Sequence, residues 1–103
     1  YKSIKTKING RLGTYKLYVA DTDKKRTLGL SGLTKPLPKR HGMIFVYNDD
    51  KIRNFTMKKT NIPLEIIFLD KDYNVLNTVR ANPRQQNSIE SKGECRYVVE
   101  LMR

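Results

Sequence analysis

The side chains that could perform acid–base chemistry are few and lie far apart in the sequence. His41 is the single histidine, so a Ser-His-Asp or Cys-His arrangement could form only through it. It lies in a proline-containing stretch, Thr34 to Gly42, which the two prolines predict to be a loop. A loop is a poor place to fix a general base. Cys95 is the single cysteine, which rules out an internal disulfide and a Cys-based zinc site and favours a buried, inert thiol.

The carboxylates fall into two groups, and both groups lie in turn-like segments. Asp49-Asp50 and Asp70-Lys71-Asp72 lack the ligand spacing that a calcium-binding loop requires, so turn formation explains them better than metal binding. The six glycines match neither the dinucleotide-binding nor the P-loop spacing. We therefore expect no metal site and no cofactor.

Glu65 is a different kind of carboxylate because it enters an apolar segment directly after Pro63. A carboxylate in such a segment needs a partner that offsets its desolvation. We expect that partner to be Arg26 or Lys58.

Positive charge is the strongest compositional feature of the chain. Its 103 residues contain 21 Lys and Arg against 10 Asp and Glu, a net charge of +11. Residues 1–40 hold 11 basic and two acidic side chains, whereas residues 41–72 hold five of each. Such a field attracts acidic partners, although a solvated, lysine-rich surface is the alternative. The candidate binding residues are Glu65 and the exposed basic clusters: Lys24, Lys25, Arg26, Lys39, Arg40, Lys58 and Lys59.

The elements that must position these residues are mainly strands. The chain is long enough for one domain, residues 1–103, and its 14 Val and Ile against two Ala favour strands over helices. Alternating patterns predict a hairpin, and Asp21, Thr22 or Asp23 could cap a short helix after it. The expected elements are a hairpin of 4–8 with 15–19, a helix over 24–28, a second hairpin of 43–47 with 52–57, a central buried strand at 66–69, and strands at 75–80 and 96–101.

Four strings in this order resemble the family catalogued as domain of unknown function 192, which occurs in bacteria, archaea and bacteriophages. They span about residues 15–101 and are Val19-Ala20-Asp21-Thr22 followed by Arg26 and Gly29-Leu30, the strand Gly42 to Tyr47, the signature Phe55 to Asp70, and the closing strand Tyr97 to Leu101. Thr56 stands where the family usually has Trp, and Lys59 where it usually has Asn. The resemblance implies a small, β-rich α+β fold, with a strongly bent or partly closed, mainly antiparallel sheet and one or two short helices. It implies no activity.

The sequence favours a non-enzymatic binding or accessory domain that presents its basic surface to an acidic protein or a small anionic ligand. A nucleic-acid-binding module without sequence specificity is the alternative, because tyrosines that could stack on bases accompany the lysines. An enzyme of undescribed type comes third and would rest on Glu65, Asp70 and His41. No apolar run is long enough to span a membrane. The chain begins with Tyr1, which fits an exported protein without its signal peptide; a phage protein would act in the host cytoplasm.

Overall fold

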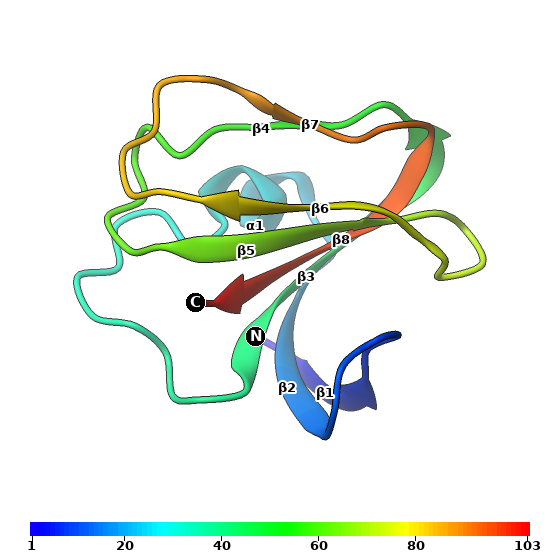
Figure 1. Cartoon of the computed structure of the whole chain (residues 1–103), viewed down its shortest axis with the longest axis horizontal. Helices are drawn as coiled ribbons and strands as arrows, with labels where there is room; N and C mark the ends of the chain where they lie inside the picture. Colours follow the sequence, from blue (N-terminus) through cyan, green and yellow to red (C-terminus); the bar gives the residue numbers. More distant parts are fainter.

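The computed structural model describes all 103 residues and contains a six-stranded sheet, a two-stranded ribbon and one short helix (Figure 1). The β-rich fold expected from the composition is therefore confirmed. In chain order the elements are β1 (Ser3–Lys7), β2 (Thr14–Ala20), α1 (Asp23–Leu28), β3 (His41–Lys51), β4 (Asn54–Phe55), β5 (Leu64–Leu69), β6 (Val75–Ala81), β7 (Ile89–Glu90) and β8 (Cys95–Met102).

The main sheet has the strand order β1-β2-β3-β8-β5-β6 and is mainly antiparallel. Only β2 and β3 run parallel, because the chain crosses between them through α1 and the proline-containing loop. Strands β1 and β6 are the two edge strands and do not pair with each other, so the sheet is open and the expectation of partial closure is not confirmed. Its strands turn steeply from β1 and β2 to β5 and β6 (Figure 1).

One face of the sheet, here called the covered face, carries the larger part of the core. Alternate residues of β3, β5 and β8 point into it, including Phe45, Phe68 and Val98, all at most 1% exposed. Helix α1 and the β4–β7 ribbon lie on this side (Figure 1), and Phe55 of β4 makes edge-on contacts with Phe45 and Phe68. The ribbon thus seals the apolar side chains from water.

The opposite face, here called the open face, has a smaller cluster of seven buried residues that includes Leu17, Ile44 and Val99. The loop after β1 reaches across it. Arg11 from this loop forms an ion pair with Glu65 of β5, and the Asn9 amide donates to the Tyr73 carbonyl oxygen at 3.3 Å. These contacts attach the β1–β2 hairpin to the far part of the sheet.

The predicted short helix is present as α1, with six residues. Thr22 is its N-cap: its hydroxyl accepts a hydrogen bond from the Lys25 amide at 3.2 Å, which satisfies a free N–H group of the first turn. Gly29 ends the helix at a positive φ of 52° that few other residues adopt. This is the single helix of the fold, and no helix has the length and apolar character needed to cross a membrane.

The expected hairpin of residues 43–47 with 52–57 is wrong. Strand β3 continues through Lys51 and pairs with β8, with an irregular register between Val46 and Lys51. The polar residues interpreted as a turn extend the strand because arginines bind their carboxylates: Arg53 binds Asp49, and Arg96 binds Asp50. Residues 54 and 55 pair instead with β7, far along the chain.

The strand predicted at residues 66–69 is β5, and its four residues are buried as expected. It lies fifth in the strand order, however, so β3 and β8 occupy the middle of the sheet. The closing strand is β8, whose Tyr97, Val99 and Leu101 share the open face as the alternation predicted. The two alternate residues, Val98 and Glu100, therefore point to the covered face.

Candidate functional site

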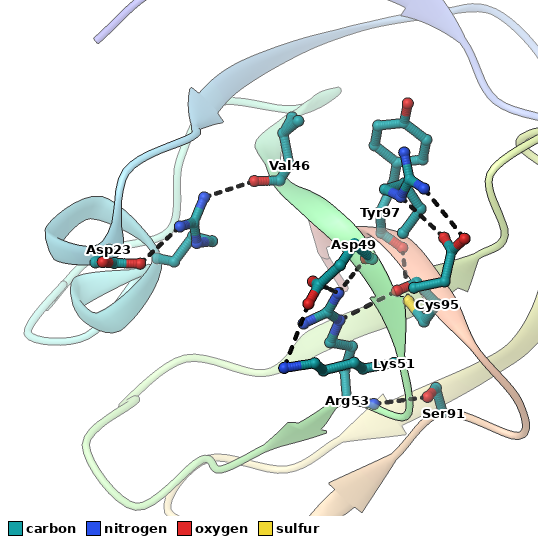
Figure 2. Close-up of polar contacts among 11 residues, drawn as sticks. Asp23, Val46, Asp49, Lys51, Arg53, Ser91, Cys95 and Tyr97 are labelled. Atoms are coloured by element: carbon teal, nitrogen blue, oxygen red, sulfur yellow. Dashed lines mark hydrogen bonds and ion pairs between the residues drawn. The ribbon is translucent and has the colours of Figure 1, made fainter.

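The basic residues of α1 differ in their roles. Lys24 is exposed and has no ion pair, whereas Lys25 lies 3.9 Å from the Asp21 carboxylate. The Arg26 guanidinium donates at 2.7 Å to the Val46 carbonyl oxygen and at 2.7 Å to the Asp23 carboxylate (Figure 2). Arg26 therefore connects α1 to β3 and is not available as a free binding cation.

Two further arginines complete a paired set at the end of β3. Arg53 donates to the Cys95 carbonyl oxygen at 3.1 Å and binds the Asp49 carboxylate at 2.7 Å, and Arg96 binds the Asp50 carboxylate at 2.8 Å (Figure 2). The bond from Arg53 is the main reason that the pKa of Asp49 is lowered. We call Arg26, Arg53 and Arg96, with their three aspartates, the arginine network. Its charges compensate one another.

Lys58 and Lys59 lie in the turn between β4 and β5, and both side chains are exposed without an ion pair. The Lys59 carbonyl oxygen accepts a hydrogen bond from the Gly32 amide at 3.1 Å, which links this turn to the loop after α1. Neither lysine contributes to the hollow that contains Lys39 and Arg40.

Lys39 and Arg40 lie close to other basic residues that were not among the candidates from the sequence. Together they line a hollow of about 440 Å³, here called the basic hollow, between the β1–β2 hairpin and the start of β3. Arg40 donates to the Leu12 carbonyl oxygen at 2.7 Å and lies over the Tyr15 ring at 5.5 Å. The residues around the hollow are Lys5, Thr14, Tyr15, Lys16, Lys39, Arg40 and His41.

The strand register places like charges side by side in this hollow. Lys5 of β1 is the direct partner of Lys16 of β2, and Lys16 is in turn the partner of His41 in β3. Directly opposite side chains on neighbouring strands lie about 5 Å apart, where like charges repel. No carboxylate lines the hollow.

His41 is not in a loop, which corrects the expectation from the prolines before it. It opens β3, and its Nδ1 lies 3.3 Å from the Tyr18 hydroxyl. Asp70 accepts hydrogen bonds from the amides of Asp72 and Asn74, which lower its pKa and fix the turn after β5. No hydrogen bond or ion pair joins His41, Asp70 and Glu65 to one another.

Glu65 has a partner, but it is not one of those expected. Its carboxylate pairs with Arg11, while Arg26 is held by Asp23. The reason is that Glu65 points to the open face, which the loop containing Arg11 crosses, whereas Arg26 reaches the sheet from the covered side.

Glu100 was not among the candidate residues that the sequence offered, and its carboxyl group is the most deeply buried of the protein. Its side chain is 5% exposed, and it forms no hydrogen bond or ion pair within the protein. Burial raises its pKa to about 8, so the carboxyl group is largely protonated at neutral pH. The sequence did contain a signal for this burial. Glu100 lies in the closing strand between Val99 and Leu101, which face the open side, so its own side chain must point to the covered face.

Glu100 lines a pocket of about 220 Å³ between α1, β3 and β4, here called the Glu100 pocket. All four strings that resemble the family contribute to its wall, although they are spread over 75 positions of the chain from Arg26 to Glu100. The residues from these strings are Arg26, Gly29, Leu30, Phe45, Tyr47, Phe55, Thr56, Thr60 and Glu100. Thr56, the departure from the family pattern, is thus part of the pocket.

The sequence of the chain matches the model of a known protein family. The family described as domain of unknown function 192, an uncharacterised ACR, matches residues 4–103. No curated protein matches the chain significantly.

Two crystal structures are similar to the fold. One is a protein from Sinorhizobium meliloti 1021 that is described as a candidate transcription regulator. It has a TM-score of 0.82 and 26% sequence identity, and the alignment covers 95% of this chain and 76% of that chain. The other, from Novosphingobium aromaticivorans DSM 12444, is described as a protein of unknown function; it has a TM-score of 0.86 and 29% identity, over 97% of this chain and 73% of that one. With the family match extending over nearly its whole length, the chain belongs to the domain of unknown function 192 family.

Proposed function

We propose that this domain is a non-enzymatic binding module whose basic hollow captures an anionic group, carried by an acidic protein segment or a small anionic ligand. The observation that carries the proposal is the register of three neighbouring strands, which aligns Lys5, Lys16 and His41 without an acidic partner. An anion in the hollow would replace the repulsion between the Lys5 and Lys16 ammonium groups with attraction.

The contrast with the arginine network supports this choice of site. Arg26, Arg53 and Arg96 each have an aspartate within 2.8 Å, so they have little free charge to offer a ligand. The ends of the Lys5, Lys16 and Lys39 side chains have no such partner. We therefore place the proposed site at Lys39 and Arg40, with Lys5 and Lys16 added, because these four basic side chains gather around one hollow.

Isothermal titration with a hexaglutamate peptide and with citrate would test the proposal. We expect binding by the wild-type chain and a loss of about tenfold or more in a Lys5→Gln, Lys16→Gln double variant, equivalent to about 1.4 kcal/mol. The matched control is Lys58→Gln with Lys59→Gln, which removes the same charge elsewhere. An equal loss in both double variants would contradict a specific hollow and leave only general attraction.

Nucleic acid is the second candidate because Arg40 and Tyr15 form a cation–aromatic pair beside the hollow, an arrangement that can contact phosphate and base together. The related structure described as a candidate transcription regulator points the same way. A random-sequence DNA titrated across a salt series separates the two candidates. Affinity that falls steeply with salt and exceeds that for hexaglutamate would favour nucleic acid, and absence of DNA binding at low salt would exclude it.

A further inference from the structure

The Glu100 pocket is separate from the basic hollow and holds an unusual acid. Glu100 points to the covered face between Met43 of β3 and Ile66 of β5, its direct neighbours in the sheet. An acid in such surroundings normally has a hydrogen-bonding partner, since its burial is otherwise unfavourable. Glu100 has none within the protein, yet its side chain lines a pocket open to solvent. The vacant partner position is therefore inside the pocket.

Four other polar side chains of the lining also have no hydrogen-bonding partner within the protein. The side chains of Thr27, Ser31, Asn54 and Thr60 make no hydrogen bond within the protein, and all four line the pocket. Thr56 accepts one bond, from the Lys58 amide at 3.1 Å. Hydroxyl and amide groups both donate and accept hydrogen bonds, and so does a protonated carboxyl group. The lining therefore suits a ligand whose own groups do both.

Charge around the pocket argues against a charged ligand. Arg26 is the one cationic side chain in the wall, and Arg53 lies behind it against the Tyr47 ring at 3.8 Å. A cationic ligand bound at Glu100 would face the Arg26 guanidinium, with a second positive charge close by at Arg53. An anionic ligand would find both guanidinium groups already bound to aspartates and would sit against a carboxyl group that can itself become negative.

Size and shape narrow the class further. The volume of about 220 Å³ is below the roughly 300 to 1,000 Å³ of pockets for drug-sized ligands. Phe45, Tyr47 and Phe55 contribute aromatic surface beside the polar groups, which offers contact for the C–H face of a saturated ring. We propose that the Glu100 pocket binds a small, neutral, polyhydroxylated ligand the size of one sugar ring, with the Glu100 hydroxyl donating to a ligand oxygen.

The proposed hydrogen bond makes binding depend on pH. The ionisable groups that face Glu100 are Arg26 from α1 and Tyr47 from β3; its neighbours on β5, including Ile66, carry no charge. The pKa of Tyr47 is raised, chiefly by burial, so Tyr47 stays neutral through the range of interest. Affinity should therefore be constant below pH 7 and fall about tenfold for each pH unit well above the Glu100 pKa of about 8.

The test uses three sugars that differ in charge: glucose, glucosamine and glucuronate. Each is titrated into ¹⁵N-labelled protein, and the amide shifts of Phe55, Thr56 and Thr60 report binding in the pocket. We expect glucose to bind, at millimolar affinity, and to shift these amides more strongly than either charged sugar. Stronger binding of glucosamine with proton release, stronger binding of glucuronate, or no shift with any of the three would overturn the proposal.

Two variants and a control assign the effect to Glu100. Glu100→Leu, which fits its apolar neighbours, should reduce glucose affinity at least tenfold. Glu100→Gln keeps a donor and an acceptor but cannot ionise, so it should retain binding within about threefold and lose the decline above pH 8. Glu94→Gln is the matched control, because Glu94 is exposed in the same part of the chain and should leave both affinity and pH profile unchanged. A Glu100→Gln variant that keeps the wild-type pH profile would also overturn the proposal.

Discussion

The arginine network and the basic hollow are both rich in positive charge, but they use it in opposite ways. At the end of β3, three arginines each bind an aspartate and two of them also bind backbone carbonyl oxygens. In the hollow, lysines and a histidine line up across three strands without a carboxylate. The difference teaches that net charge alone does not identify a binding surface, because charges already paired within the protein stabilise the fold and are unavailable to a partner.

Glu100 shows a third way in which this protein treats an ionisable group. It lies close to the arginine network, but its carboxyl group is neutral and has no charged partner. Its pKa of about 8 in the folded state lies above the usual value of about 4.5. Between these two pH values the folded state therefore binds more protons than the unfolded state. The contribution of Glu100 to the free energy of unfolding is fully present below pH 4.5. It falls as the pH rises towards 8, by up to about 1.4 kcal/mol for each pH unit. Urea denaturation from pH 5 to 8 should show this decline in the wild type and a flatter profile in Glu100→Gln. A wild-type profile as flat as that of the variant would mean that Glu100 has a partner.

The next largest effect concerns Arg53, the most extensively bonded member of the arginine network. Arg53→Gln should reduce the free energy of unfolding by about 2 to 3 kcal/mol, because the Cys95 carbonyl oxygen and the Asp49 carboxylate lose their donor. Urea denaturation measures the loss. The control is Lys51→Gln, whose exposed side chain also binds Asp49, at 3.3 Å, and should change stability by less than about 0.5 kcal/mol. Equal effects would show that this end of β3 is only a surface cluster.

Arg26 and Lys24 provide a comparison within one helix. Arg26→Gln should destabilise the protein by about 1 to 2 kcal/mol, since the Val46 carbonyl oxygen loses its donor and α1 loses its attachment to β3. Lys24→Gln, on the exposed side of α1, should be neutral within about 0.5 kcal/mol. Thermal denaturation of both variants under one condition compares them. A neutral Arg26→Gln would return Arg26 to the list of free binding residues.

The smallest expected effect has the opposite sign. Lys16→Gln removes the like charge opposite Lys5 and beside His41, so it should stabilise the domain by about 0.2 to 1 kcal/mol at low salt. The gain should shrink as added salt screens the repulsion. Lys92→Gln, an exposed lysine outside the hollow, is the control in the same salt series. Destabilisation by Lys16→Gln would indicate that the hollow is compensated by a contact within the protein.

Much of the fold followed from residue patterns, because alternation and local caps depend on neighbours in the sequence. The hairpin of β1 and β2, the buried strand β5 and the short helix after Thr22 were all predictable in this way. The β3–β8 pairing was not, because its partners lie about 50 residues apart and the turn-like segment from Asn48 to Lys51 suggested a local hairpin. Of the residues in the two proposed sites, the sequence offered Lys39 and Arg40 as candidates but not Lys5, Lys16 or Glu100.

The sequence by itself determined the charge, the strand-forming segments and the faces on which alternate residues of each strand lie, since these depend on composition and a period of two. The tertiary structure alone decided which strands are neighbours. That choice put Lys5, Lys16 and His41 in one row, gave Glu65 its partner Arg11, and enclosed Glu100 beneath α1 and β4. The physical reason is that the burial and pairing of a charge depend on residues remote in the chain, and only the packed sheet brings them together.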